Sequence, residues 1–342
     1  MKKQKKVLWI VGLICAGAFL FYGSALARPI ELNFNLFISA THERNVHCHK
    51  PWIENIEKAS GGKVKITPYY SNSLTPLPEK FDATVAGIAD ISECLTWTSP
   101  WRFALSEMLM LPELGMPGAE AAGKAWWHMY KTEPAMQKNF AGVKLLFVHT
   151  SPHLMIATRD KPIRKLDDLK GLKICAFGKL PVQTVKALGA TPVGLTPGEV
   201  YLALDKGVID GTTSDFEINL SRRFYESTKY IVTNIQVMHT TFFVVMNQGV
   251  WDGLPPDVQK AFEQYSGDWA VDFYGKTRDR EEQYAKEKLS EKGVQFTQIS
   301  PEESAKAKKL VEPVKANYAA EVEARGMPGK KVLEALQNYS KK

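Results

Sequence analysis

The sequence predicts an α/β protein with two domains. Three observations support this: strand and helix patterns alternate along the chain, 342 residues suit two domains better than one, and one helical pattern is too long for a small domain. Residues 166–211 show the alternation most clearly. Apolar runs at Leu172 and near Pro192 are each followed by a helical pattern, and a third strand begins after Gly207. Strands that alternate with helices in this way form parallel sheets.

Two side chains stand where strands of this segment are expected to end. Cys175 closes the first apolar run, and Asp215 follows the third strand. Ligands of open α/β sheets bind beyond the carboxyl ends of the strands. We therefore treat Cys175 and Asp215 as candidate ligand contacts.

The first half of the chain repeats the same alternation. Its patterns predict strand 30–37, a helix ending near 60–62, strand 64–70, helix 77–87, strand 89–95, helix 119–132 and strand 143–149. We therefore expect residues 28–150 to contain a β-α-β-α-β unit of their own, followed by a further helix and strand.

The second half contains the longest helical pattern. Apolar residues recur every three or four positions over residues 255–292, after the start signal Pro255-Pro256 and before the stop signal Gly293. A helix of this length would span on the order of 55 Å, so we expect it to lie across two lobes. The remaining elements are helix 220–226, strands 230–232, 242–246 and 294–299, and two C-terminal helices separated at 326–329.

The N-terminus has the pattern of a secretory signal peptide. Four lysines precede an apolar stretch of about 15 residues, which is short for a membrane span, and Ala25-Leu26-Ala27 fits a cleavage site. We expect cleavage after Ala27 and a periplasmic location; an uncleaved membrane anchor is the alternative. Removing the four lysines reduces 44 basic residues to 40 against 37 acidic residues, a net charge of +3. This balance and the lack of an aromatic-rich basic patch argue against nucleic-acid binding.

Histidine and cysteine patterns give little support for a metal. His42, His47, Cys48 and His49 lie close in sequence, but residues two apart do not share a helix face. We expect an exposed helix start there, with no metal and no cofactor. Three cysteines remain after processing, so at least one thiol is free, and a disulfide between Cys48 and Cys94 stays open.

Several segments resemble the DctP-type solute-binding proteins of TRAP (tripartite ATP-independent periplasmic) transporters. The segments are LDDLKGLKI at 166–174, ALGATP at 187–192, EVYLALDKGVIDG at 199–211, SGGKVKI at 60–66, FYESTKY at 224–230, and VVMN at 244–247 followed by Trp251. They keep the family's order over nearly all of the mature chain. GxSxG, P-loop and GxGxxG motifs are missing, so the sequence offers no competing enzyme motif.

The resemblance implies a two-lobed periplasmic-binding-protein fold with crossing strands and a long helix spanning both lobes. The first lobe would comprise residues 28–150 and about 241–275, and the second lobe residues 151–240 and about 276–342. It also implies a monomeric, non-enzymatic receptor that closes around a small organic solute and delivers it to the TRAP membrane permease.

Three positions depart from the family's ligand-binding pattern. Cys175 stands where the family has the arginine of its KIR segment, and Met155 stands where some members have a second arginine. The family's DGQENP reads DGTTSD here, so that Ser214 replaces a ligand-binding Asn and Asp215 replaces Pro. The planar fork of Arg binds a carboxylate through two hydrogen bonds, which neither Cys nor Met can do.

We therefore expect a cationic or neutral-polar ligand, held by carboxylates and aromatic faces. The expected contacts are Phe37, Glu43, His47, Trp97, His239 and Thr241 on the first lobe, and Met155, Cys175, Phe177, Ser214 and Asp215 on the second. Asp215 is equally compatible with a helix N-cap.

Other interpretations remain open. An organic acid would need a substitute cation, for which Lys179, Arg159 and Arg102 are candidates. A periplasmic enzyme with Cys175 as nucleophile would need a base such as His153, but no Cys-His signature is present. A sensor subunit that presents the same solute to a signalling partner is the third possibility.

Overall fold

The computed structural model describes residues 28–99 and 101–340 of the 342-residue chain. The predicted signal peptide, its cleavage site and the alternative anchor lie outside these residues. The strands are β1 (Ile30–Asn35), β2 (Val64–Tyr69), β3 (Ile91–Leu95), β4 (Val143–Thr158), β5 (Lys173–Cys175), β6 (Thr191–Val193), β7 (Gly211–Ser214), β8 (Tyr230–Val232), β9 (Met238–Asn247) and β10 (Gln295–Thr297).

Helices surround these strands. The α-helices are α2 (Lys50–Ala59), α3 (Lys80–Val85), α4 (Ala104–Glu107), α5 (Ala119–Thr132), α6 (Pro134–Gln137), α7 (Lys179–Ala187), α8 (Val200–Asp205), α9 (Phe216–Ser221), α10 (Gln248–Gly253), α11 (Pro256–Gln264), α12 (Gly267–Glu291), α13 (Pro301–Glu323) and α14 (Gly329–Tyr339). A π-helical turn, η1 (Asn45–His49), precedes α2. Short 3₁₀ turns are η2 (Leu77–Glu79), η3 (Thr96–Thr98), η4 (Met108–Met110), η5 (Lys138–Phe140), η6 (Leu166–Leu169) and η7 (Phe224–Glu226).

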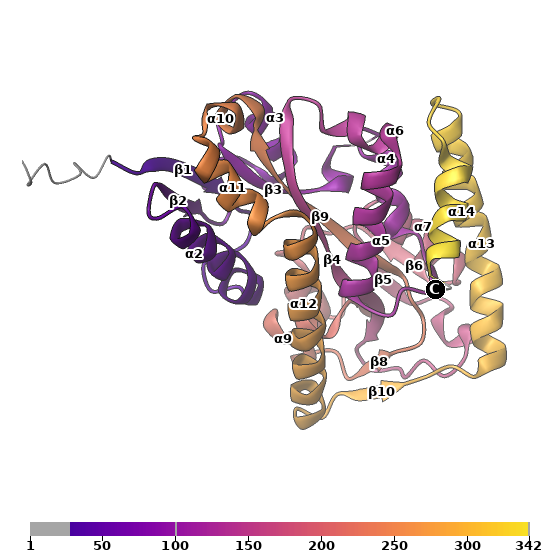
Figure 1. Ribbon diagram of the computed structural model, residues 1–342. Coiled ribbons are helices and arrows are strands. Elements are labelled where there is room, and N and C mark those ends of the chain that lie inside the picture. The colour runs from indigo at the N-terminus through magenta and orange to yellow at the C-terminus, as the bar shows by residue number, and fades with distance from the viewer. Residues whose placement is uncertain (1–27, 100, 341–342) are drawn as a thin grey trace, which may run out of the picture.

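Two strands, β4 and β9, cross between the two halves of the sheet. The strand order is β2-β1-β3-β9-β4-β7-β5-β6, with β8 added to β4 and β10 to β8. β4 and β9 run antiparallel from the Val143–Asn247 pair to the Leu154–Met238 pair. In Figure 1 these two strands run diagonally through the molecule behind α12. The predicted two-lobed α/β fold with crossing strands is confirmed, and the assignment of residues to each lobe stays a prediction.

The crossing strand β4 continues beyond the predicted end near residue 149. The β4–β9 register shifts between Thr150 and His153, around Ser151 and Pro152. Proline has no N–H to donate to the ladder, and a bulge is one of the few strand positions that tolerate it. This interruption hid the second half of β4 from the sequence pattern.

The long helical segment predicted over residues 255–292 is confirmed and is bent. α11 ends at Gln264, and Ser266 has an extended backbone with φ −114° and ψ −166° before α12 begins. Figure 1 shows α12 lying across the crossing strands, between α9 and α5. The bend lets α11 pack against α2 while α12 follows the crossing strands.

Two carboxylates of α12 hold neighbouring helices by their N-termini. Asp279 accepts hydrogen bonds from the backbone N–H of Ala119, at 2.7 Å, and of Glu120, at 3.1 Å, where α5 begins. Glu282 accepts from the N–H of Phe216 and Glu217 where α9 begins, at 2.9 and 3.0 Å. The first N–H groups of a helix have no partner within it, and its N-terminus favours negative charge. α12 therefore fixes α5 and α9 relative to the crossing strands.

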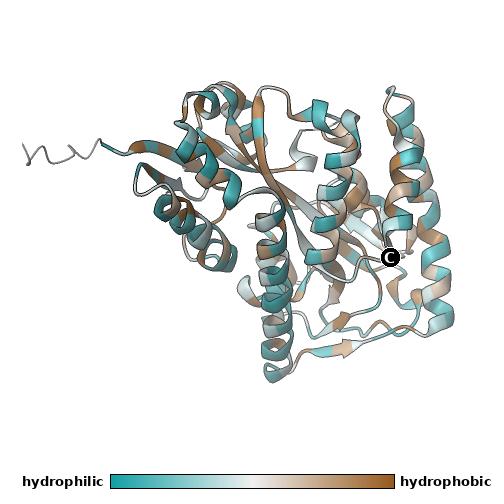
Figure 2. Ribbon diagram, in the orientation of Figure 1, coloured by the Kyte–Doolittle hydropathy of each residue, from teal (hydrophilic) through white to brown (hydrophobic). Residues whose placement is uncertain are grey.

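The largest apolar core surrounds the crossing strands. Trp52, Trp126, Phe147 and Phe243 are fully buried in it. Figure 2 shows mostly hydrophilic residues along the visible face of α12. Within residues 28–99 and 101–340, no helix is long and apolar enough to cross a membrane.

Candidate functional site

A groove of about 600 Å³ lies between η1 and α9, with α12 along its side. Its lining residues are Glu43, Val46, His47, Pro51, Glu217, Leu220, Ser221, Phe273, Thr277, Arg280, Glu281, Tyr284 and Ala285. Glu43 and His47, two of the expected ligand contacts, are therefore on its wall, each with about half of its side chain exposed. The groove brings together a turn of the first half of the chain and a helix of the second half.

Charged side chains link the two walls of this groove through α12. His47 Nδ1 on η1 lies 2.9 Å from Glu281 Oε1 on α12. Arg278 donates to Glu281 and, at 3.0 Å, to Glu217 Oε2 on α9. Arg278 is only 3% exposed, so its charge is largely desolvated. This chain of contacts ties η1 to α9.

Asp215 is the N-cap of α9. Its Oδ1 accepts a hydrogen bond from the N–H of Ile218 at 2.7 Å, and its Oδ2 lies 4.0 Å from Arg278 Nη2. Burial and the neighbouring charge of Glu217 raise the pKa of Asp215 to about 7. For Glu217, burial acts to raise the pKa, but the charges of Arg278 and His42 and the hydrogen bonds from Arg278 and Ser221 together outweigh it and lower the pKa to about 2. Asp215 thus serves the local structure of α9, as the N-cap interpretation predicted.

A second cluster contains Arg44, which the sequence analysis passed over. Arg44 is 4% exposed, with Nε 3.1 Å from Glu93 Oε1 and Nη2 3.2 Å from Glu93 Oε2. Its guanidinium carbon lies 4.3 Å from the ring centre of Phe242 and 5.1 Å from that of Phe37. The two rings stack in parallel, 6.2 Å apart. The expected contact Phe37 therefore lies beside a buried cation.

Glu93 is the counter-charge of this cluster. Besides Arg44, it faces His49 Nε2 and His149 Nε2, each 3.0 Å from Oε1. Burial acts to raise the pKa of Glu93, but the charges of Arg44 and His49 outweigh it and hold the pKa well below its usual range. Burial lowers the pKa of His149 to about 3. Glu93 is therefore ionised and Arg44 is its partner.

The two residues that replace family arginines are packed among apolar side chains. Cys175 is fully buried with Val200, Leu204 and Phe224, and burial raises the pKa of its thiol to about 11. Phe177 is half-buried against the same cluster. Met155 belongs to a different cluster that faces α12. Met155 and Cys175 therefore pack in two different apolar clusters.

The remaining expected contacts lie on or beside the crossing strands and have local partners. Ser214 accepts from Asn219 Nδ2 at 3.0 Å, and the hydroxyls of Thr241 and Thr96 lie 2.5 Å apart. Trp97 follows Thr96 and is half-buried. His239 Nδ1 lies 3.0 Å from Ser151 O, and burial lowers the pKa of His239 to about 4.

The three cations considered as substitutes for the missing arginine have partners elsewhere. Lys179 pairs with Glu321 and lies 4.8 Å from the ring centre of Trp101. Arg159 lies 3.8 Å from Asp160, and Arg102 donates to Asn139 O at 3.2 Å. Within the described part of the chain, these contacts lie away from Phe37 and Phe242. The sequence signal that could have identified a cation of the site was Arg44, which lies in the polar turn after the first strand.

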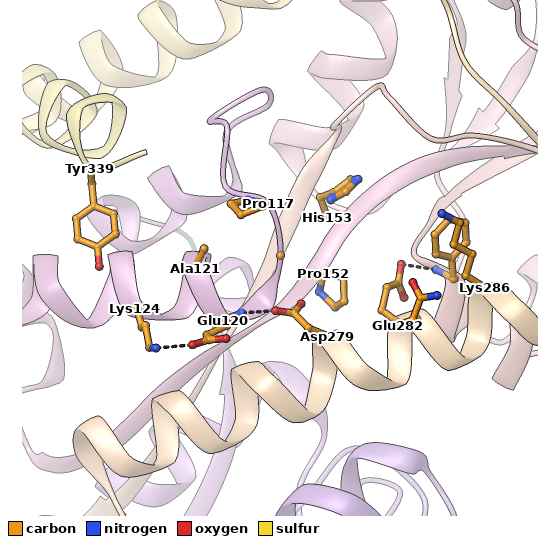
Figure 3. A pocket seen from close by; sticks show the side chains of 13 residues that line it. Pro117, Glu120, Ala121, Lys124, Pro152, His153, Asp279, Glu282, Lys286 and Tyr339 are labelled. Carbon is orange, nitrogen blue, oxygen red and sulfur yellow. Dashed lines mark hydrogen bonds and ion pairs between the residues drawn. The ribbon is translucent and has the colours of Figure 1, made fainter. Parts of the chain in front are cut away.

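A pocket of about 550 Å³ lies on the opposite face of α12. In Figure 3, Asp279 and Glu282 project from α12 toward this pocket, and a dashed line joins Asp279 to the backbone N–H of Glu120 and another joins Glu282 to that of Phe216. Lys124 is paired with Glu120 in the same view. These charged groups are occupied by helix capping and ion pairing, so this pocket is a weaker candidate for the solute.

Metal and disulfide chemistry do not define the site. Over residues 28–99 and 101–340, no group of three or more His, Cys, Asp and Glu side chains is placed to hold a metal ion. Cys48, Cys94 and Cys175 are buried free thiols, so Cys48 and Cys94 do not form a disulfide in this structure.

Two α/β lobes joined by crossing strands, with a groove between elements of the two halves, define a solute-binding protein of the periplasmic type. The family model of the bacterial extracellular solute-binding proteins, family 7 (DctP), matches residues 38–321. The chain therefore belongs to the DctP family.

Individual relatives agree over nearly the whole chain. The C4-dicarboxylate-binding periplasmic protein DctP of Rhodobacter capsulatus is 24% identical over 327 residues, covering 91% of this chain and 93% of the relative. A TRAP solute-binding protein of Rhodoferax ferrireducens, solved with copurified benzoate, has a TM-score of 0.84 and 25% identity, covering 91% of this chain and 97% of the other. A marine metagenome TRAP protein specific for aromatic acids has a TM-score of 0.85 and 26% identity, covering 91% and 98%.

Membership in this family establishes the general role of the chain. It is a periplasmic solute-binding receptor of the TRAP type, and the proteins of this family are receptors and not enzymes. The buried, high-pKa thiol of Cys175 agrees with this, because a nucleophilic cysteine needs a lowered pKa.

Proposed function

We propose that this receptor captures a small organic carboxylate between its lobes by hinge closure and delivers it to a TRAP membrane permease. The observation that carries the proposal is Arg44, a buried arginine against two aromatic rings just beyond the carboxyl end of β1. The carboxyl ends of parallel strands are where α/β proteins bind ligands. Arg44 supplies the guanidinium that is missing at position 175.

The relatives support an acid. The Rhodobacter protein is named for C4-dicarboxylates, and the Rhodoferax protein holds benzoate. The marine protein was solved with metahydroxyphenylacetate and is specific for aromatic acid ligands. Aromatic rings next to a cation also suit an acid with an apolar body.

A cationic or neutral-polar ligand is the second candidate, and one observation favours it. Asp215 Oδ2 is buried without a hydrogen-bond partner, and Glu217 lies next to it, so the α9 side of the groove carries surplus carboxylates. An ammonium group would pair with them. The comparisons favour the acid over this ligand.

Calorimetric titration with matched pairs tests the choice. Benzoate and benzylamine share a ring and differ in charge, and so do acetate and methylamine. The proposal expects the carboxylate of a pair to bind and its amine to bind at least about tenfold more weakly. Binding of the amines alone would overturn it. Small-angle X-ray scattering with and without the bound acid tests hinge closure, which should shorten the radius of gyration.

The permease partner requires a separate test. The purified receptor should support uptake of the bound acid into vesicles that contain the TRAP permease encoded beside it. A receptor that binds the acid but supports no uptake would favour the sensor interpretation.

A further inference from the structure

We infer that Arg44 receives the ligand's carboxylate directly and that the ligand is a monocarboxylate with a flat, apolar body. The inference rests on the proposed function and names the contact and the ligand class within it. Four observations carry it: the free edge of the guanidinium, its aromatic support, its position facing the second half of the chain, and the charges around it.

The guanidinium of Arg44 meets Glu93 along one edge only. Nε and Nη2 face the two oxygens of Glu93, at 3.1 and 3.2 Å. Among residues 28–99 and 101–340, no hydrogen bond or ion pair joins Nη1 to an acceptor. Arginine has five N–H donors in a fixed fork, so the Nη1 edge can bind a carboxylate while Glu93 keeps the other edge.

Two aromatic rings fix the plane of this fork. Phe242 and Phe37 both lie within 5.1 Å of the guanidinium carbon, and their rings are within 8° of parallel. Stacking of a guanidinium on aromatic faces orients it, and the same rings offer apolar area to a flat ligand. Phe37 is only partly buried, which leaves part of its ring available.

Arg44 is the N-cap residue of η1, and the contacts of His47 with Glu281 and of Arg278 with Glu281 and Glu217 join η1 to α9. The charge of Arg44 is among the influences on the pKa of Asp215, after burial, Glu217 and Arg278, and it lowers that pKa. It also lowers the pKa of His42, second to burial. A carboxylate on Arg44 would therefore lie between the turn after β1 and the N-terminus of α9, where closure encloses it.

The surrounding charges select against a second carboxylate. Glu93 is the ion-pair partner of Arg44, and Asp215 and Glu217 at the start of α9 share Arg278 as their cation. One ligand carboxylate can accept hydrogen bonds from the free edge of Arg44. A second one would be brought toward buried carboxylates without a counter-charge, which is unfavourable at low local dielectric.

The experiment compares benzoate with terephthalate, whose second carboxylate points away from the first. Both ligands are titrated into the mature wild-type protein and its single-residue variants. The wild type should bind benzoate at least about tenfold tighter than terephthalate. Arg44→Gln should weaken benzoate about 30-fold or more, the loss expected when one side of a buried charge pair is removed. Lys179→Gln removes a cation outside the cluster and should leave the affinity unchanged.

A purely structural role for Arg44 predicts a different pattern. Glu93→Gln removes the negative charge that competes with the ligand but keeps an acceptor for Arg44. If Arg44 contacts the ligand directly, this variant should bind benzoate equally well or more tightly. If the Arg44–Glu93 pair is only structural, the variant should bind benzoate more weakly. If Arg44→Gln does not fold, Arg44→Lys is measured instead, because lysine keeps the positive charge and lacks the planar fork of donors. Its affinity for benzoate should be at least about tenfold weaker than that of the wild type. Unchanged affinity in the Arg44 variant that folds overturns the contact.

The outcomes separate this inference from the proposed function. If the wild type binds carboxylates and the Arg44 variants bind them equally well, only the inference fails. If terephthalate binds as tightly as benzoate, the monocarboxylate class fails. If amines bind and no carboxylate does, both the proposed function and this inference fail. Both also fail if the wild type binds neither the amines nor the carboxylates.

Discussion

Replacing Arg278 with Met should destabilise the fold, and most strongly at neutral pH. Arg278 is the shared cation of Glu217, Glu281 and Asp215 at a place where nearly all solvent is excluded. The pKa of Glu217 is lowered from 4.5 to about 2. This difference corresponds to roughly 3 kcal/mol of stabilisation by its surroundings, within the range measured when one partner of a buried ion pair is removed.

The sign of the pH dependence follows from the direction of that pKa. Because the folded-state pKa of Glu217 lies below the unfolded value, its contribution is present above pH 4.5 and lost as the pH falls toward 2. Asp215 acts oppositely: its folded-state pKa is raised, so its contribution is lost as the pH rises from 3.8 through about 7. The variant should therefore lose about 3 kcal/mol at pH 7 and clearly less at pH 3.5.

Urea unfolding at the two pH values measures the loss, with Arg280→Gln as the matched control. Arg280 lies two residues away on the same helix, is exposed, and bonds only Thr277 within the described residues. It should change the unfolding free energy by less than about 0.5 kcal/mol. Adding Glu217→Gln to Arg278→Met should recover part of the loss. An equal loss at both pH values, or no recovery in the double variant, would refute the electrostatic argument.

Three further predictions concern packing and capping. The thiol of Cys175 is buried with a raised pKa, so native protein should react with Ellman's reagent far more slowly than protein unfolded in urea. Asp215→Ala should lower the free energy of unfolding by about 1 kcal/mol in the same urea assay, because it removes the N-cap of α9. Asp215→Asn should lower it less, because asparagine keeps a hydrogen-bond acceptor and removes a charge beside Glu217. Gly275→Ala should lower the melting temperature in calorimetry, because the added Cβ would lie 2.5 Å from Glu120 Cα where α12 meets α5; an unchanged melting temperature would mean that the helices can separate freely.

The fold was predictable because its signals are local and repeated. Alternation of strands and helices predicts the parallel parts of the sheet, and the spacing of apolar residues predicts the long helical segment. The second half of β4 was not predictable from periodicity, because Pro152 falls in its middle. A proline in a strand usually marks its end, and only the pairing with β9 shows that the strand continues.

Part of the candidate site could be located from the sequence, and its ligand contacts stay predictions. Glu43 and His47 line the groove and Phe37 lies in the Arg44 cluster, because all three belong to the segment that follows the first strand. The sequence did not predict Arg44 as a site residue, because the family's arginine is expected at position 175 and the substitutes considered were other cations. Burial of Arg44 by Glu93 depends on contacts 49 residues apart, which no local pattern reveals.

This chain has Cys175 where the family has an arginine, and it has a buried arginine at position 44 instead. The free-energy cost of burying a charge connects these two features. Cys175 is packed in an apolar cluster that includes Val200, Leu204 and Phe224. Arg44, in contrast, has Glu93 as a counter-charge that is held ionised. An uncompensated buried guanidinium is far less favourable than a paired one. Under the proposed function, the cation that meets the solute has therefore moved from a strand of the second lobe to a turn of the first. The acid would dock on the first lobe, and closure would then bring α9 and its carboxylates against the ligand's apolar end.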